Sequence, residues 1–406
     1  MPAQQTKLIR TVRRGCPICG GTRAECLLRQ EFCLYQGHCL PDSYDLVSCA
    51  QCGFVYADTR ATQKEYNQYY NLFSKYESAQ GPCGINPHEA HKYERIIKDL
   101  DDILPGKEAS VLDIGCAKGG LLITMQQHGY QHLTGLDPSP NCVQQVRQQG
   151  IRAIQGGLFA ENFGTEQLED RYDCVILSHI LEHVVDLQTA VRRTVPLVKP
   201  GGFLYIEVPD AARYTRYYVA PYSYFELEHI NHFDRQALDN LMSEYAGDLT
   251  AAGDKDVRHS TLICYPAVYV IYRLQNRDGA SRRIVPGSVA RENVRRYIEM
   301  SRQGMYWPEL EDLAAGQEEI VVWGAGAYAM RLYRTTRLKD CRINSFVDND
   351  PKKHGARFDS GVVIRSPREV LSDFSGPIVV CSAVYNHEIV EEIQALGLEN
   401  RLIVLR

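Results

Sequence analysis

The sequence predicts an α/β protein in three units: a cysteine-rich module, a doubly wound parallel sheet, and a second, smaller α/β unit. Its 406 residues, 44% of them hydrophobic and 23% charged, suit about two or three globular domains. Short apolar runs alternate with amphipathic stretches over residues 90–245 and again over 319–406, as in parallel sheets. Seven of the 14 cysteines lie in the first 52 residues.

The apolar runs give the expected strands. They cover 110–114, 132–136, 172–177 and 203–208 in the larger unit, then 320–323, 343–347, 378–382 and 401–405 in the smaller one. Residues 281–312 are charged and helix-prone, which predicts a connecting helix. The predicted units are therefore a cysteine module over 1–65, a core over 66–280, and a linking helix with a Rossmann-like domain over 281–406.

Charge and hydropathy exclude several function classes. Lys and Arg (45) and Asp and Glu (50) are mixed along the chain, with a net charge of −5, so we expect no nucleic-acid partner. No apolar run approaches the roughly 18 residues of a membrane span. The N-terminus lacks the apolar stretch of a secretory signal, which predicts a cytoplasmic protein. The oligomeric state stays open.

Two cysteine pairs predict a metal site. Cys16 and Cys19 form one Cys-x-x-Cys-Gly knuckle, and Cys49 and Cys52 form the other. Four thiolates suit tetrahedral Zn²⁺ and close the site, so we expect a structural ion. The alternatives are a thioredoxin-like redox pair or cysteines buried as small apolar residues. The residues between the knuckles, any of which could substitute as a ligand, are expected to lie outside the site: Cys26, Cys33, His38 and Cys39.

A glycine-rich turn follows the first strand of the core. Asp113 ends that strand, and Gly115, Cys116 and Gly119 form the turn before the next helix. Glycines let a ligand approach the backbone at the carboxyl edge of a sheet. The next strand ends in Asp137 and Pro138, where a carboxylate can bind ribose hydroxyls.

This turn resembles motif I of the class I S-adenosylmethionine-dependent methyltransferases. The resemblance implies a Rossmann-like methyltransferase core that binds S-adenosylmethionine through the glycine turn and Asp137. It also implies that Gly157 and Leu158 lie by the adenine, and that Ser178 and His179 lie in the exit loop of the fourth strand. A doubly wound fold that binds another ligand, or none, is the alternative.

Two histidine-rich stretches offer bases for the methyl acceptor. One holds His179, Glu182 and His183 after the fourth strand, and the other runs from Glu226 to His232 after the fifth. Histidine titrates near cell pH, so it suits proton removal. Glu228, His229 and His232 could instead bind a metal ion. His179 and His232 could also simply fill polar niches.

The layout of the whole chain resembles that of the sugar C-methyltransferases, which join a zinc domain, a methyltransferase core and a C-terminal α/β domain. The resemblance implies a 4-keto sugar on a thymidine nucleotide as the substrate. It implies the pair Glu228–His229 as the source of the general base, with His183 nearby. It also implies a catalytic tyrosine among Tyr69, Tyr70 and Tyr76.

Two segments depart from that family. Arg258-His259-Ser260-Thr261 lacks the glycines of the family's His-Gly-Gly-Ser-like turn, and residues 67–86 differ from its linker. Both face the acceptor in the family. Methylation of a hydroxyl or amine, on a sugar or another natural-product intermediate, therefore stays open. A cofactor-binding partner subunit without turnover of its own is a third hypothesis.

Two further features concern the acceptor. Tyrosines are dense over 205–224, which suits contact with a sugar or base, although ordinary packing explains them equally well. In the smaller unit, Gly324, Gly326 and Ala329 follow a strand, and Asp348 ends the next. Together with residues 347–355, they resemble the nucleotide-sugar-binding domains of sugar-modifying enzymes. We expect a nucleotide seat there, with a purely structural role or an NAD site as alternatives.

Overall fold

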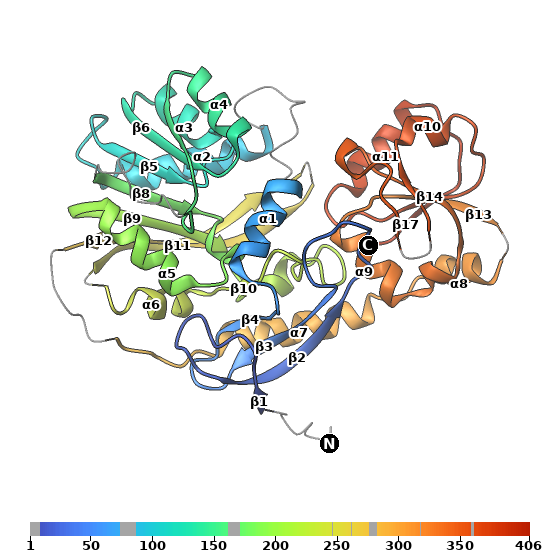
Figure 1. Ribbon diagram of the computed structural model, residues 1–406, viewed down its shortest axis with the longest axis horizontal. Helices are drawn as coiled ribbons and strands as arrows, with labels where there is room; N and C mark the ends of the chain where they lie inside the picture. The colour runs from blue at the N-terminus through green and yellow to red at the C-terminus, as the bar shows by residue number, and fades with distance from the viewer. Residues whose placement is uncertain are drawn as a thin grey trace.

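The computed structural model of the protein describes residues 9–73, 87–160, 171–245, 247–260, 262–275, 282–316, 318–358 and 361–406. Figure 1 shows a large sheet with its helices, a smaller α/β unit beside it, and an N-terminal sheet beneath them. None of the described helices is long and apolar enough to cross a membrane.

The N-terminal unit is an antiparallel sheet in the order β1-β2-β3-β4-β10. Its last strand, β10, comes from the central part of the chain and pairs with β4 through Asn231 and His232. The strands are β1 (Ile9–Thr11), β2 (Arg23–Glu31), β3 (Ser43–Cys49), β4 (Val55–Asp58) and β10 (Asn231–His232). Helix α1 (Gln63–Phe73) follows this sheet.

The central sheet has seven strands in the order β11-β12-β9-β8-β5-β6-β7. Strands β7, β6, β5, β8 and β9 are mutually parallel, whereas β12 runs antiparallel to both of its neighbours. The order reverses between β5 and β8, which places a ligand crevice at their carboxyl ends. The strands are β5 (Ser110–Ile114), β6 (His132–Asp137), β7 (Arg152–Gln155), β8 (Tyr172–Ser178), β9 (Val198–Pro209), β11 (Gly247–Arg258) and β12 (Cys264–Leu274).

Helices cover both faces of the central sheet. One apolar core joins the sheet to α2, α3 and α4, and a second joins its other face to α5, α6 and the cysteine knuckles. The helices are α2 (Pro87–Asp101), α3 (Gly120–Gln127), α4 (Pro140–Gln148), α5 (Leu187–Thr194) and α6 (Arg235–Met242). The short helices are η3 (Leu181–His183), η4 (Val195–Leu197) and η5 (Tyr214–Tyr217).

The C-terminal unit is a parallel sheet in the order β15-β14-β13-β16-β17. Its strands are β13 (Glu319–Trp323), β14 (Arg342–Val347), β15 (Ile364–Arg365), β16 (Ile378–Val380) and β17 (Leu402–Val404). Its helices are α9 (Ala327–Thr335), α10 (Pro367–Leu371) and α11 (Asn386–Ala395), with short helices η6 (Arg337–Asp340) and η7 (Pro351–Lys353). Helices α7 (Val289–Gln303) and α8 (Pro308–Ala315) lead into it, and α7 runs beneath the molecule in Figure 1.

A buried arginine ties the three units together. Arg331 of α9 donates to the Gln30 side chain of β2 at 2.8 Å and to the carbonyl of Phe225. The guanidinium also lies over the ring of Phe32, 5.0 Å from its centroid. One apolar core runs through all three units. The acceptor-side segments of the chain are therefore held against both neighbouring units.

Most predicted strands are confirmed within one or two residues, although β9 is longer than expected and β16 ends at Val380. The connecting helix is present as α7 and α8. Of the two explanations for the tyrosines of 205–224, ordinary packing applies to most of them. Tyr214 stacks on Tyr224 with centroids 3.9 Å apart, and both are buried, as are Tyr205 and Tyr222. They belong to the packed interior because the segment crosses between units.

Candidate active site and metal centre

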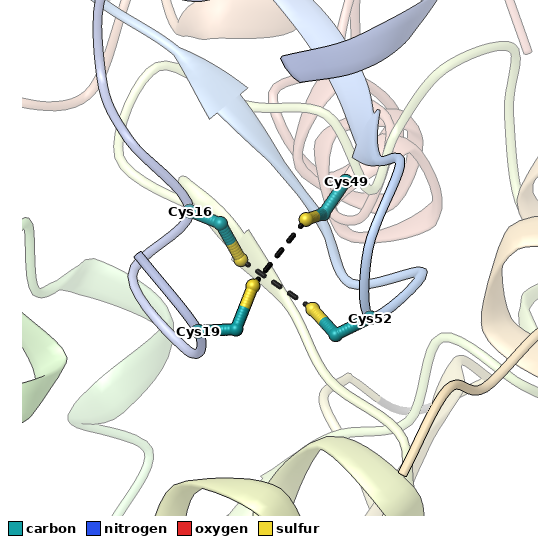
Figure 2. A group of neighbouring side chains, drawn as sticks. All are labelled: Cys16, Cys19, Cys49 and Cys52. Carbon is teal, nitrogen blue, oxygen red and sulfur yellow. Dashed lines mark hydrogen bonds between the residues drawn. The ribbon is translucent and has the colours of Figure 1, made fainter. Parts of the chain in front are cut away.

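Four cysteine sulfurs converge beneath the central sheet (Figure 2). Cys16 and Cys19 come from the turn after β1, Cys49 ends β3, and Cys52 lies in the turn before β4. The Sγ atoms of Cys16 and Cys52 are 3.5 Å apart, as are those of Cys19 and Cys49, and all four lie within 4.8 Å of one another. Each knuckle turns through a glycine with positive φ, Gly20 at 77° and Gly53 at 81°.

This geometry fits a tetrahedral ion. Bonds of about 2.3 Å place the sulfurs of a four-thiolate zinc site about 3.8 Å apart. The shortest contacts join one knuckle to the other, whereas a dithiol redox pair needs contact within one knuckle. Among the described residues, Cys26, Cys33, His38 and Cys39 lie outside this cluster, as expected.

The glycine turn lies at the carboxyl end of β5, in the predicted crevice. Gly115 and Gly119 have φ angles of 77° and 80°, and Ala117 between them has 47°. A Cβ on Gly115 would stand 2.2 Å from Ile180 Cδ1, and one on Gly119 would stand 2.7 Å from Val146 Cγ2. The backbone can therefore adopt this close turn only with glycine at both positions.

Two aspartates flank the turn. Burial raises the pKa of Asp113 to about 7, Lys92 opposes the shift, and Asp137 adds to it. Asp137 ends β6 and accepts hydrogen bonds from the amides of Ala117 and Ser139, both at 2.9 Å. Its carboxylate is thus fixed against the glycine turn, where it can face the ribose of a nucleoside.

The other predicted cofactor residues surround the same edge. Pro138 is exposed beside α4, Gly157 borders open space, and Leu158 is buried. The thiol of Cys116 is buried, and a Cβ at Gly135 would lie 2.6 Å from its sulfur. Cys116 can therefore offer only its backbone to a ligand at the glycine turn. Ser178 ends β8 with its hydroxyl buried, and that hydroxyl has no hydrogen-bond partner in the described part of the chain.

His179 is held between two buried carboxylates. Its Nδ1 lies 3.1 Å from Glu182 Oε1 and its Nε2 lies 3.2 Å from Glu207 Oε1. Burial acts to lower the pKa of His179, but the two carboxylates raise it above its ordinary value. Its backbone is left-handed, with φ at 57°. Both ring nitrogens of His179 thus face buried carboxylates, which favours the polar-niche alternative over a role as a base.

The carboxylates around His179 belong to a larger buried ion network. Lys255 Nζ lies 3.0 Å from Glu207 Oε2, 2.6 Å from Asp99 and 2.6 Å from the hydroxyl of Tyr205. These ion pairs and the histidine lower the pKa of Glu207 despite its burial. Glu207 and Lys255 were not predicted from the sequence, although a glutamate inside the apolar run 203–208 is a signal of a buried ion pair.

His179 should make folding stability depend on pH. Its folded pKa is raised, so its contribution is present below the unfolded value of about 6.5 and is lost as the pH rises through the folded value. We expect His179→Gln to lower the free energy of unfolding more at about pH 5.5 than at about pH 9. Urea unfolding of both proteins at the two pH values measures this, and an equal loss at both would contradict it.

The predicted acceptor residues meet beside this network. His183 lies on η3, its ring centroid is 4.8 Å from that of His229, and the ring of Tyr70 packs on it at 5.5 Å. His183 Nδ1 donates to the carbonyl of Glu228 at 3.1 Å. Burial lowers the pKa of His183, and because Nδ1 donates to a carbonyl, the lone pair of the neutral ring lies on Nε2. Tyr76, predicted as catalytic, lies outside the described residues.

The structure does not bring the ligand atoms of Glu228, His229 and His232 together, as the metal alternative for this region requires. His232 lies in β10, is buried, and places its Nδ1 3.1 Å from the hydroxyl of Tyr214. Burial lowers the pKa of His232 to about 3. It does not join Glu228 and His229, because pairing of β10 with β4 turns it into the interior. The ligand atoms that gather within 4.8 Å of one another belong to Glu182, His183 and His229.

Aromatic side chains extend from this site to the C-terminal unit. The ring centroid of Tyr265 lies 5.5 Å from that of His179, and that of His259 lies 5.7 Å from Tyr265. Tyr385 follows β16, and its hydroxyl is 3.4 Å from His259 Nε2. Residues from the predicted Arg258–Thr261 turn thus lie at the boundary of two units, although Thr261 itself is outside the described residues.

The glycine turn of the C-terminal unit repeats the arrangement of the core. Asp348 accepts from the amide of Ala325 at 2.8 Å, as Asp137 does from Ala117. Here Lys353 also lies 3.0 Å from the carboxylate. Gly324 has a φ of 114°, and Gly326 caps α9 without a side-chain hydrogen bond.

Comparison with known proteins agrees with this geometry. Residues 88–247 match the family described as a methyltransferase domain, and residues 316–404 match one described as C2185-like, N-terminal. The ubiquinone biosynthesis O-methyltransferase of Bordetella avium is 34% identical over 113 residues, which cover 27% of this chain and 45% of that protein. The corresponding protein of Leptothrix cholodnii is 32% identical over 158 residues, which cover 36% and 63%.

The chain thus spans less than two thirds of the length of these curated relatives. Among solved structures, the N-methyltransferase NodS of Bradyrhizobium japonicum in complex with S-adenosylhomocysteine is 16% identical, with a TM-score of 0.37. That match covers 52% of this chain and 97% of NodS. Residues 88–247 thus match a methyltransferase domain, and their sheet has the strand order of a Rossmann-like fold with the glycine turn at the strand-order reversal.

Proposed function

We propose that the chain transfers the methyl group of S-adenosylmethionine to a nucleotide-linked keto sugar, at the carbon beside the ketone. One observation carries this proposal: His183, on η3 after β8, packs against His229 from the segment between β9 and β10. The sulfonium is already activated, so the protein has to supply alignment and a base. His183 and His229 are candidate bases on the acceptor side.

The chemistry follows from the acidity of the acceptor. A carbon beside a ketone is acidic enough for a carboxylate or imidazole to take its proton, whereas an unactivated C–H group is not. The base then comes from the pair Glu228–His229, and the resulting enolate carbon attacks the methyl group. Tyr44 and Tyr66 hold this segment, since they donate to the carbonyls of Glu226 and Leu227 at 3.0 and 3.2 Å.

The C-terminal unit supports a nucleotide handle on the acceptor. Its glycine turn and the first turn of α9 offer backbone amides at the carboxyl edge of a parallel sheet, a common seat for phosphates. The loop after β16 begins at this edge and reaches His259 of the core through Tyr385. A nucleotide bound at this edge would therefore lie on the side of the C-terminal unit that contacts the core.

We further propose that the four cysteines hold a structural Zn²⁺ ion. The sulfur spacing suits the ion, and four protein ligands leave no open position for a substrate. The ion would fix the knuckles against α5, where Gln188 donates to the carbonyls of Pro17 and Ile18 at 3.2 and 3.0 Å. Its role is then to fix the N-terminal sheet, whose last strand β10 directly follows His229.

Methylation of a hydroxyl is the second candidate. It is favoured by the curated relatives, which are named O-methyltransferases. Their match covers a quarter to a third of this chain, so it does not decide the acceptor. The third hypothesis, a cofactor-binding subunit without turnover, has less support because the candidate bases gather beside the cofactor crevice.

Proton exchange separates these functions. A thymidine-diphosphate 4-keto sugar is incubated in D₂O with the protein and S-adenosylhomocysteine, and deuterium at the carbon beside the ketone is measured by NMR. We expect exchange above the rate without protein, and none with His229→Ala. No exchange, together with methylation of a sugar hydroxyl, would overturn C-methylation in favour of the second candidate.

A further inference from the structure

Glu182, His183 and His229 bring one carboxylate and two imidazoles together on the acceptor side. We propose that these three side chains hold a divalent transition-metal cation that binds the oxygen of the acceptor. This inference rests on the proposed methyl transfer and specifies how the acceptor is activated. It replaces the sequence-based ligand set, because Glu182 takes part and His232 does not.

The three ligand atoms already lie close together. All are within 4.8 Å of one another, and His183 Nε2 is 3.9 Å from Glu182 Oε1. Metal bonds of about 2.1 Å place tetrahedral ligands about 3.4 Å apart, so the cluster closes on an ion after a small contraction. His229 is half-buried at the end of an irregular segment and can supply that movement.

Glu182 supplies the independent sign of a ligand. Its side chain is 1% exposed, and Oε1 accepts from His179. The second oxygen, Oε2, is buried and accepts no hydrogen bond from any residue that the structure describes. A buried carboxylate oxygen without a hydrogen-bond donor destabilises the folded protein. A bound cation removes that penalty.

The second coordination sphere is also in place. His183 donates its Nδ1 proton to the carbonyl of Glu228, which fixes the tautomer and leaves the Nε2 lone pair facing Glu182. Metal-binding histidines commonly have this arrangement. Glu182 is oriented in the same way by His179, which Glu207 holds from behind.

Three protein ligands leave open positions, which is typical of catalytic rather than structural sites. The cation would coordinate the ketone oxygen of the acceptor. The C–H bond beside the ketone breaks, its proton passes to the Glu228 carboxylate, and its electron pair forms an enolate on the cation. The enolate carbon then bonds to the methyl group, and the S–C electron pair returns to sulfur. His229 thus serves as a ligand, and Glu228 is the base of the pair.

Manganese binding tests the site without relying on turnover. Mn²⁺ prefers carboxylate and imidazole to thiolate, so it does not compete for the four cysteines. The zinc-loaded full chain is titrated with Mn²⁺, and the free ion is measured by electron paramagnetic resonance. We expect one bound Mn²⁺ per chain, and affinity at least about 10-fold weaker in Glu182→Gln and in His229→Asn. His128→Asn, at an exposed histidine next to the C-terminal end of α3, is the matched control and should bind Mn²⁺ as the wild type does.

Thermal unfolding and S-adenosylhomocysteine binding identify a variant that is misfolded. If Glu182→Gln fails to fold, His229→Asn still tests the site, because His229 is only half-buried. Absence of bound Mn²⁺, or binding unchanged in both variants, would overturn the metal site. Proton exchange that persists in a chelator would then leave the proposed function standing. Failure to bind S-adenosylhomocysteine would instead remove the proposed function itself.

Discussion

Cys49→Ser is expected to release the zinc ion and to lower the melting temperature by about 10 °C or more. Cys49 ends β3 and is 1% exposed, so the serine leaves three thiolates and a buried hydroxyl around the ion. Structural zinc sites bind with apparent free energies of about 10–16 kcal/mol, and that binding contributes directly to folding. The N-terminal sheet also includes β10, so the loss of stability should extend to the acceptor side.

Metal analysis and calorimetry of the purified variant measure both effects. Cys26→Ser is the matched control, because Cys26 lies on β2 of the same sheet but is exposed and outside the cluster. It should retain its zinc and its melting temperature. A Cys49→Ser protein with full zinc content and unchanged stability would contradict the assignment.

His229→Ala is expected to lower kcat by about 10²-fold or more while leaving S-adenosylhomocysteine affinity unchanged. The ring of His229 lies against His183 on the acceptor side, whereas the glycine turn lies at the end of β5. The loss follows whether His229 takes the proton itself or holds the cation, since either role acts on the acceptor. Steady-state rates and calorimetric titration give the two quantities.

His128→Ala provides the control for this substitution. His128 lies next to the C-terminal end of α3, its side chain is 37% exposed, and its partner is Glu94 at 3.0 Å. The His128→Ala variant should keep the wild-type kcat and the wild-type affinity for S-adenosylhomocysteine. Retained activity in His229→Ala would show that the acceptor is activated elsewhere.

Local patterns were sufficient for the cofactor side of the molecule. The apolar run 110–114 and the glycines after it form β5 and its turn at the expected residues, because strand and turn are both specified by neighbours in the sequence. The cysteine knuckles were predictable for the same reason. Each is a local turn, and only the pairing of the two knuckles is long-range.

The features of the site that could not be predicted from the sequence depend on contacts between segments far apart in the chain. His232 is buried because Asn231 and His232 pair with β4, more than 170 residues earlier in the chain. The surroundings of His179 were not predictable because Glu207, one of its two carboxylate neighbours, lies on β9, 28 residues along the chain. Strand β11 was not predicted, since few of its residues are apolar and its burial alternates only over 254–258.

Methyl transfer to a nucleotide-linked acceptor is tested by calorimetric titration of the full chain with S-adenosylhomocysteine. That complex is then titrated with thymidine and uridine diphosphates. We predict that the cofactor product binds one per chain and that a nucleoside diphosphate binds to the complex. Binding of the cofactor product alone would contradict the nucleotide-linked acceptor. Absence of any binding of S-adenosylhomocysteine would contradict methyl transfer by this chain.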